Sequence, residues 1–281
     1  YVAGLYKNNP ESGMIDEGHG SYIAKYSPDG REKWRFKWEL YPLNIIAGND
    51  SLYLIGQFFD KTDFDPGKGE DYIDLISAGF LTKFTSDGKY VGTRPFPSYM
   101  MVTNINSIAL DSKGNLLIGG GESVNPRNGK DSREYCGVLY KLDPDANDIW
   151  SRRWAGGAVG CYVTCISVDN NDNIFVGGTL SFGQTMWNTG NPDMDPSEKW
   201  DTHRIHKDDI YLSKFDTDGN FMWSGTWGND NMEWVRSIAN DKSGGIYMLG
   251  SFDGTVDFDP GPGKSIVKGT GLEAFLLKLQ E

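Results

Sequence analysis

An all-β protein is predicted by three features of this 281-residue sequence. Short apolar runs rich in Val, Ile, Tyr, Phe and Trp alternate with polar positions, which is the side-chain period of a β-strand. Turn signals built on Asp, Asn and Gly separate the runs, and no segment keeps a helical period. The whole series of runs recurs about every sixty residues, so the fold is built from repeats.

Each repeat contains four runs that we interpret as strands. The third repeat shows all four in order: "SIALD" at 107–111, "LLIGG" at 116–120, "GVLYKLD" at 137–143 and "DIWSRRW" at 148–154. Short turns join the first run to the second and the third to the fourth, so each repeat is an antiparallel meander. Four-stranded meanders at this period predict a β-propeller, and counting them gives five blades.

Three kinds of residue mark the same places in successive repeats. A glycine ends the second strand, a lysine interrupts the third, and two tryptophans four residues apart lie on the fourth. The marker residues are Gly4, Gly56, Gly120, Gly178 and Gly250; Lys25, Lys83, Lys141, Lys214 and Lys278; and the pairs Trp34 and Trp38, Trp150 and Trp154, and Trp223 and Trp227. Because residues four apart on a strand share one face, we expect the tryptophans to fill the space between adjacent blades.

Strand order follows from Pro95, which falls in the fourth strand of the second repeat. Proline is tolerated only at a sheet edge, so the fourth strand is the outer edge and the first lines the central channel. One propeller domain is expected over residues 1–281, with repeats at about 1–42, 43–103, 104–161, 162–233 and 234–281. The first repeat lacks its first strand and the last lacks its fourth. Either these strands belong to a longer chain, or the ring closes in an unusual way.

The stretch "SIANDKSGGIYMLGSFDGTVDFDPGPG" followed by "EAFLLKL" resembles the bacterial SBBP-type β-propeller repeat family, whose units carry a DFDPG loop. The resemblance covers the whole chain and is strongest in the second, fourth and fifth repeats, whereas the first and third lack the DFDPG loop. It implies a secreted or cell-surface bacterial propeller, often without an assigned activity. The chain begins without Met and shows no signal-peptide pattern, as expected of a mature or trimmed product.

Charge and composition restrict the partners. The formal net charge of −12 argues against binding to nucleic acid or to an anionic membrane surface. No apolar run reaches 18 residues, so no membrane insertion is expected. Cys136, Cys161 and Cys165 are too few for a disulfide scaffold and are expected to be buried free thiols.

The connections between the second and third strands, hereafter the long connections, are long and unequal and share one rim. They span about 7–20, 59–78, 121–135, 181–207 and 253–272. Irregular loops on a rigid scaffold are where binding usually occurs. We therefore predict a non-catalytic scaffold that binds a protein or glycan through this rim. Trp187 and Trp200 are the candidate ligand contacts, and capping of the longest connection is the alternative role.

Three long connections contain the pattern Asp–apolar–Asp–Pro, which supports two interpretations. In the first, the apolar residue docks into the blade and the carboxylates accept main-chain N–H bonds. In the second, the carboxylates bind calcium. The structural interpretation is preferred, and no cofactor is expected. The calcium candidates are Asp63, Asp65, Asp193, Asp195, Asp257 and Asp259.

A glycan-active enzyme, a hydrolase or lyase, is the alternative function. It needs two carboxylates near the channel mouth, and Asp230 and Glu233 are the best candidates. Of the three histidines, His19, His203 and His206, the last two lie in the longest connection near Asp201, Asp208 and Asp209. They raise the further alternative of a transition-metal site, and a solvated loop is the preferred interpretation. No nucleophile elbow, phosphate loop or zincin motif is found, which favours a protein without catalysis.

Overall fold

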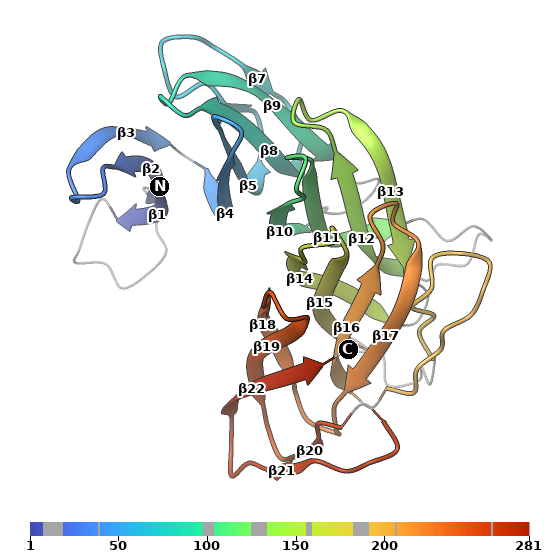
Figure 1. The fold of residues 1–281 in the computed structure, drawn as a ribbon. Helices are drawn as coiled ribbons and strands as arrows, with labels where there is room; N and C mark the ends of the chain where they lie inside the picture. The colour runs from blue at the N-terminus through green and yellow to red at the C-terminus, as the bar shows by residue number, and fades with distance from the viewer. Residues whose placement is uncertain are drawn as a thin grey trace. The chain divides into compact units, whose positions relative to one another are not determined.

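The computed structural model describes residues 1–7, 19–38, 40–97, 104–124, 134–155, 159–181, 191–205, 207–259 and 261–280. Every regular element in these ranges is a β-strand, arranged as five successive antiparallel meanders (Figure 1). The prediction of an all-β, propeller-like repeat is confirmed at this level. Within the described residues, nothing has the length and apolar character of a membrane-crossing helix.

The first two sheets lie in the N-terminal part of the chain. The first contains β1 (Val2–Lys7), β2 (His19–Tyr26) and β3 (Glu32–Trp38) in that order. The second contains β4 (Tyr41–Gly48), β5 (Ser51–Phe59), β8 (Ser77–Thr85) and β9 (Tyr90–Pro97). Pro95 lies on β9, at the edge of its sheet, as predicted from the lack of an N–H donor.

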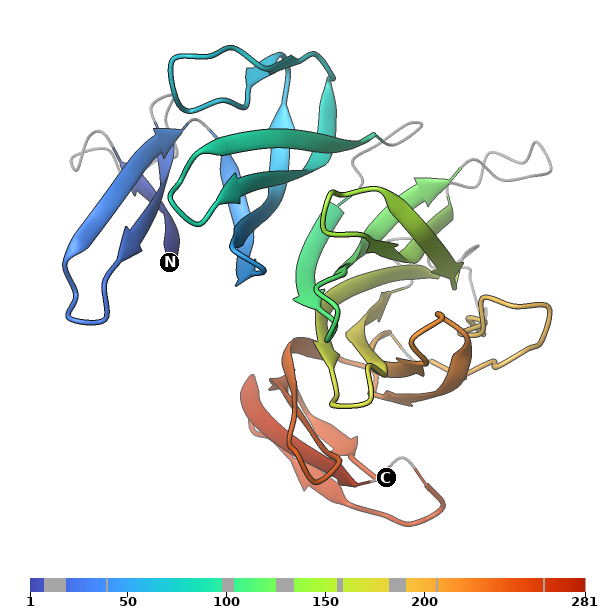
Figure 2. The same cartoon turned by 45° about the horizontal axis from the view of Figure 1, so that its top comes forward.

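The remaining three sheets repeat this order (Figures 1 and 2). The third contains β10 (Asn104–Leu110), β11 (Leu116–Val124), β12 (Glu134–Leu142) and β13 (Asp148–Trp154). The fourth contains β14 (Gly160–Val168), β15 (Ile174–Ser181), β16 (Asp208–Phe215) and β17 (Phe221–Trp227). The fifth contains β18 (Trp234–Asn240), β19 (Gly245–Phe252) and β22 (Glu273–Gln280).

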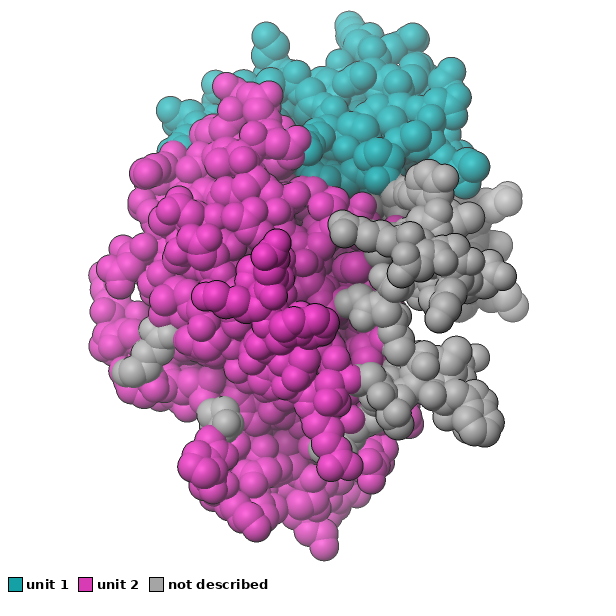
Figure 3. Space-filling model, turned by 90° about the vertical axis from the view of Figure 1, so that its right-hand side faces the viewer, with its two compact units in different colours: residues 1–108 teal, residues 109–281 magenta. Residues whose placement is uncertain are grey.

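The chain divides into two compact units, residues 1–108 and residues 109–281 (Figure 3). The boundary falls inside β10. That all 281 residues form one domain stays a prediction.

An aspartate holds the turn between the third and fourth strands in the third and fourth sheets, and Ser27 and Thr85 take its place in the first and second sheets. In the fourth sheet, Asp216 Oδ1 accepts the N–H groups of Asp218 (2.9 Å) and Asn220 (2.8 Å). Gly219 completes the turn with a φ of 75°, in the left-handed region that favours glycine. The Asp- and Gly-rich signals therefore form turns because short side chains satisfy the main-chain donors locally.

The recurring glycine of the second strand is required by close contacts in the second, fourth and fifth sheets. It lies inside the strand, which continues to Phe59, Ser181 and Phe252, so the expectation that the glycine ends the strand is wrong. A Cβ at Gly178 would lie 1.9 Å from the carbonyl oxygen of Tyr162 on β14 and 2.8 Å from the ring of Tyr211 on β16. A Cβ at Gly56 would meet the carbonyl oxygen of Tyr41 and the ring of Phe80. A Cβ at Gly250 would meet the carbonyl oxygen of Trp234 and the ring of Phe275. The strands can pack at this distance only because the glycine has no side chain.

The recurring lysine ties one sheet to the next. Lys25 Nζ donates to the carbonyl of Ser86 at 2.7 Å, and Lys141 Nζ donates to that of Thr217 at 2.9 Å. Both acceptors lie in the turn before the fourth strand of the following sheet. Lys141 also forms a buried ion pair with Asp111 at 3.0 Å. Lys25 and Lys141 therefore mark packing between neighbouring sheets and need no ligand to explain them.

The tryptophan pairs fill the space between sheets, as predicted. Trp154 belongs to a buried cluster that includes Leu180 and Phe215 of the fourth sheet. Trp227 belongs to a second cluster, with Met248 and Phe252 of the fifth sheet. Trp154 and Trp227 are each 3% exposed, and Trp38 is 6% exposed. The second tryptophan of each pair is therefore a core residue.

Candidate functional site

The three Asp–apolar–Asp–Pro segments lie in short two-stranded ribbons within the long connections, where the sequence analysis expected loops. In the second sheet β6 (Thr62–Asp63) pairs with β7 (Tyr72–Ile73), and in the fifth β20 (Thr255–Asp257) pairs with β21 (Ile266–Lys268). In the fourth, Asp193 and Thr202 form a single bridge. We call residues 62–73, 193–202 and 255–268 the connection ribbons.

The first aspartate of each ribbon accepts two main-chain hydrogen bonds. Asp63 Oδ1 receives the N–H groups of Asp65 (3.1 Å) and Asp71 (2.9 Å). The other two ribbons repeat this pair of bonds. Asp193 Oδ1 accepts the N–H groups of Asp195 and Asp201, and Asp257 Oδ1 accepts those of Asp259 and Ser265. The N–H bonds from Ser265 and Asp259 lower the pKa of Asp257, because they favour the ionised carboxylate.

The second aspartate caps the turn at the tip of the ribbon. Asp65 Oδ1 accepts the N–H of Gly67 at 2.7 Å, and Asp259 Oδ1 that of Gly261 at 2.7 Å. In the ribbon of the fourth sheet, Asp195 accepts the N–H of Ser197. These carboxylates hold their own loops, as the structural interpretation expected.

The apolar residue between the aspartates is buried in all three ribbons. Phe64 is fully buried, with its ring edge-on to Trp38 (centroids 6.2 Å apart) and Phe58 (4.9 Å). Met194 is fully buried beside Trp154, and Phe258 is 5% exposed in the cluster that holds Trp227. The ribbon is thus anchored against the second tryptophan of the preceding sheet.

Calcium binding by the six ribbon aspartates stays a prediction. In the ranges that the structure describes, no group of three or more His, Cys, Asp or Glu side chains is arranged to hold a metal ion. One oxygen of each aspartate already accepts a main-chain N–H, so the ribbons have a structural explanation without an ion.

A pocket of about 630 Å³ opens beside the ribbon of the second sheet. Phe59 and Tyr72 border it with about half of their surface exposed, and Lys61 Nζ lies 4.7 Å above the Tyr72 ring. Aromatic faces beside charged groups suit a ligand with both apolar and polar surfaces. The full lining is Lys37, Trp38, Phe59, Lys61, Thr62, Asp63, Asp65, Pro66 and Tyr72. Phe59 and Tyr72 were not singled out from the sequence, because both lie in the connection expected at 59–78, where no spacing rule distinguishes an exposed ring from a buried one.

Trp200, predicted as a ligand contact, is 80% exposed on the ribbon of the fourth sheet. A tryptophan left in solvent on an anchored ribbon is a candidate binding residue. Trp187 lies outside the described residues. Other large apolar side chains are also exposed on the long connections: Ile76, Ile266, Val267 and Leu272.

The two carboxylates predicted for an enzyme differ in their exposure to solvent. Asp230 is exposed, whereas Glu233 is fully buried, with Oε2 accepting the N–H of Asn229 at 3.3 Å and with no hydrogen-bond partner at Oε1 among the described atoms. Burial, with Asp209, Asp208 and Asp253 nearby, raises the pKa of Glu233 to about 7. Asp253 was missed because it lies in another repeat.

Replacing Glu233 with glutamine should change the pH dependence of stability. The pKa of Glu233 is higher in the folded than in the unfolded protein. Its contribution to the free energy of unfolding is therefore complete below pH 4.5 and is lost as the pH rises through about 7. We expect Glu233→Gln to raise the free energy of unfolding at pH 8 by about 1–3 kcal/mol, with a smaller effect at pH 5. Urea melts from pH 5 to 8 measure this, with Asp230→Asn as the exposed control. An equal effect at both pH values would contradict the assignment.

Asp201, His203 and Ser224 form a cluster that the sequence did not reveal. Ser224 Oγ lies 2.7 Å from His203 Nε2, and Asp201 Oδ2 lies 3.1 Å from the same nitrogen. Ser224 and Asp201 share one ring nitrogen, whereas a catalytic serine and its carboxylate contact opposite nitrogens. The opposite nitrogen, Nδ1, faces Thr226 Oγ1 at 3.3 Å. The cluster ties the ribbon to β17, as the hydrogen bond from Tyr90 to Asp71 does in the second sheet. The side chain of His19 and all of His206 lie outside the described residues.

The cysteines do not contribute to a reactive site. Cys136, Cys161 and Cys165 are free and buried, as predicted. Burial raises the pKa of Cys161 and of Cys165 to about 12, so both are protonated thiols at neutral pH.

Comparisons with known proteins give distant likenesses. No family model matches the chain. It is 24% identical over 115 residues to an uncharacterized WD repeat-containing protein of Acanthamoeba polyphaga mimivirus, across 41% of this chain and 8% of that protein. A crystal structure of a GH43_12 retrieved from capybara gut metagenome aligns over 93% of this chain and 49% of its own length, with 14% identity and a TM-score of 0.36. The chain thus spans less than half of either protein.

Proposed function

We propose that this chain is a five-bladed β-propeller that binds a glycan or a protein through the connection ribbons and carries out no catalysis. Five successive meanders with the same strand order support the blade count. The similarity of the ribbons to DFDPG loops supports membership of the SBBP-type repeats and, with it, a bacterial extracellular or cell-surface location. Nucleic acid is not proposed as a partner, given the net charge of −12.

The observation that carries the proposal is the exposure of aromatic rings on anchored ribbons. Phe64 and Met194 hold their ribbons in the core, while Tyr72 and Trp200 on the same ribbons are 52% and 80% exposed. A rigid backbone that presents exposed rings costs little entropy on binding. Rings beside Lys and Asp side chains, as in the pocket at Tyr72, are typical of sugar and peptide recognition.

Binding should depend on these rings. We expect Tyr72→Ala and Trp200→Ala each to weaken binding of a ligand found by glycan-array and peptide-array screening by at least about ten-fold, the loss of roughly 1.4 kcal/mol. Isothermal titration calorimetry gives the affinities. Ile149→Ala is the matched control, because Ile149 is 49% exposed on β13, away from the ribbons. A ligand whose affinity survives both ring substitutions would contradict binding at the ribbons.

A glycan-active enzyme is the second candidate, and Glu233 is the observation that favours it. A carboxyl group with a pKa of about 7 is partly protonated at neutral pH and can serve as a general acid. Turnover of aryl glycosides by the wild type that is lost in Glu233→Gln would replace the binding proposal with this one.

A further inference from the structure

The ribbon of the second sheet has two residues that the other ribbons lack, Lys61 and Tyr72. Tyr72 lies opposite Asp63, the first aspartate of its ribbon, and Lys61 lies two positions before that aspartate. The equivalent residues are Asn191 and Thr202 in the fourth sheet and Thr255 and Ile266 in the fifth. All three ribbons form the same main-chain bonds to their first aspartate, so neither Lys61 nor Tyr72 is needed to build a ribbon.

Lys61, Asp63 and Asp65 supply polar atoms that the ribbon itself does not use. Lys61 Nζ lies 4.7 Å from the centre of the Tyr72 ring, and none of the described carboxylates pairs with it. The main-chain bonds to Asp63 and Asp65 all use Oδ1, and no described group donates a hydrogen bond to Oδ2 of either residue. All three residues line the pocket beside this ribbon, which therefore offers a cationic donor and two carboxylate acceptors to a ligand.

The charges that line this pocket balance, with Lys37 and Lys61 against Asp63 and Asp65. A charged ligand would be attracted by one pair and repelled by the other. A sugar hydroxyl both donates and accepts, so neighbouring hydroxyls can satisfy a lysine and an aspartate together. The Tyr72 ring, 52% exposed, offers an apolar face to the C–H side of a pyranose. The volume of about 630 Å³ is typical of a small-molecule site and accommodates a short oligosaccharide.

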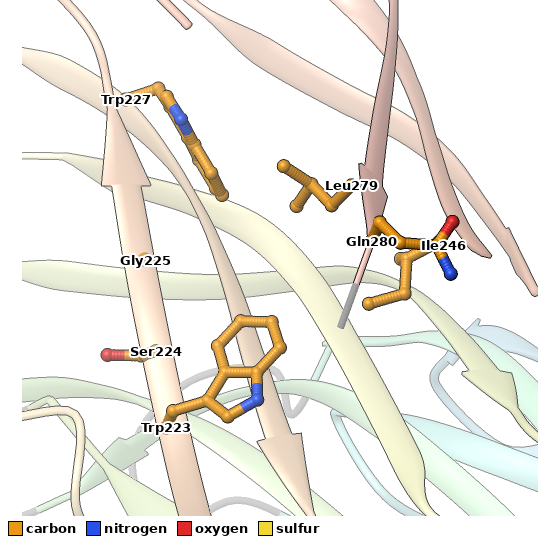
Figure 4. A pocket seen from close by; sticks show the side chains of 7 residues that line it. All are labelled: Trp223, Ser224, Gly225, Trp227, Ile246, Leu279 and Gln280. Carbon is orange, nitrogen blue, oxygen red and sulfur yellow. The ribbon is translucent and has the colours of Figure 1, made fainter. Parts of the chain in front are cut away.

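A second pocket, of about 290 Å³ between β17 and the fifth sheet, differs in its chemistry. Figure 4 shows the rings of Trp223 and Trp227 on the side of β17 that faces Leu279 and Ile246. None of the residues that line this pocket is charged, and it continues the packed cluster that contains Trp227 and Ile246. It is therefore part of the core packing, and we assign no ligand to it.

We propose that the pocket beside the ribbon of the second sheet binds a neutral oligosaccharide, with one pyranose ring stacked on the exposed part of Tyr72. Lys61 donates a hydrogen bond to one sugar oxygen, and Asp63 Oδ2 accepts one from the neighbouring hydroxyl. Lys61 and Tyr72 determine the specificity of the site, because the other ribbons lack both. The inference rests on the proposed binding at the ribbons and names the ligand class of one of them.

The test measures binding of four neutral tetrasaccharides, cellotetraose, xylotetraose, mannotetraose and maltotetraose, and of anionic tetragalacturonate, by isothermal titration calorimetry. We expect saturable binding of at least one neutral sugar, at least ten-fold tighter than that of tetragalacturonate. Lys61→Thr and Tyr72→Ile introduce the residues of the fifth sheet's ribbon, and each should weaken that binding at least ten-fold. Val91→Ala is the control, because Val91 is 53% exposed on β9 of the same sheet, outside the ribbons.

Circular dichroism checks that the variants fold; if either ribbon variant does not, the other decides. The inference is overturned if no neutral sugar binds, if tetragalacturonate binds within ten-fold of the best neutral sugar, or if binding survives Lys61→Thr and Tyr72→Ile. A ligand from the array screens that Trp200→Ala weakens and Tyr72→Ile does not would overturn the inference and leave the proposed function standing. A ligand that neither substitution weakens would overturn both.

Discussion

Gly178→Ala is expected to unfold the protein or to lower its free energy of unfolding by more than about 3 kcal/mol, above the usual cost of an overpacked core. The added methyl group would lie 1.9 Å from the main-chain oxygen of Tyr162, and a backbone atom cannot move aside as a flexible side chain can. Relief requires β14 and β15 to separate where they pair, at Val163 and Gly178. A urea melt followed by circular dichroism measures the loss.

Gly92→Ala is the matched control for this prediction. Gly92 also lies in a strand, β9, but a Cβ there would meet nothing within 4 Å. The substitution should leave stability unchanged or raise it by up to about 1 kcal/mol, because alanine restricts the unfolded chain. If Gly178→Ala and Gly92→Ala melt alike, the close packing at the second-strand glycine is wrong.

Phe258→Ala is expected to cost about 3–5 kcal/mol, the usual range for a buried aromatic residue. The ring packs edge-on to Phe252 at 5.4 Å and tilted to Phe275 at 5.0 Å, and it joins the ribbon to the core cluster of the fifth sheet. Its removal leaves a cavity and frees the ribbon at the same time. Thermal and urea melts give the change.

The control lies on the same ribbon. Ile266 is 58% exposed on β21, so Ile266→Ala should change stability by less than about 0.5 kcal/mol. A Phe258 variant as stable as the Ile266 variant would show that the residue between the aspartates is not an anchor.

The strands and turns within each repeat were predictable because the same local residue pattern recurs from repeat to repeat. The Asp-Gly turn and the edge position of Pro95 each follow from short-range chemistry. Comparison of repeats also identified the burial of Phe64 and Phe258, since an apolar residue between two aspartates recurs without a strand period. The packing of whole sheets against one another is a long-range property, and short-range patterns carry no signal for it.

The candidate sites were only partly predictable, because they join distant segments. Glu233 was singled out, but its burial near Asp253 depends on packing between connections of two repeats. His203 and Ser224 meet across 21 residues, and no spacing rule connects them. The exposure of a side chain is equally hard to predict from the sequence. Tyr72 and Phe64 are aromatic residues of the same ribbon, yet Tyr72 is 52% exposed and Phe64 is fully buried.

We expect the ribbons, which are held by their own main-chain hydrogen bonds, to keep their conformation without an ion. The most direct test is the melting temperature of the wild type in EDTA and in calcium chloride, beside that of Asp259→Asn. The account predicts nearly equal melting temperatures in both buffers and a small loss in the variant, because an amide oxygen still accepts the Gly261 N–H. A drop of many degrees in EDTA, restored by calcium and absent in Asp259→Asn, would contradict it, since an ion that binds the native state adds stability by mass action.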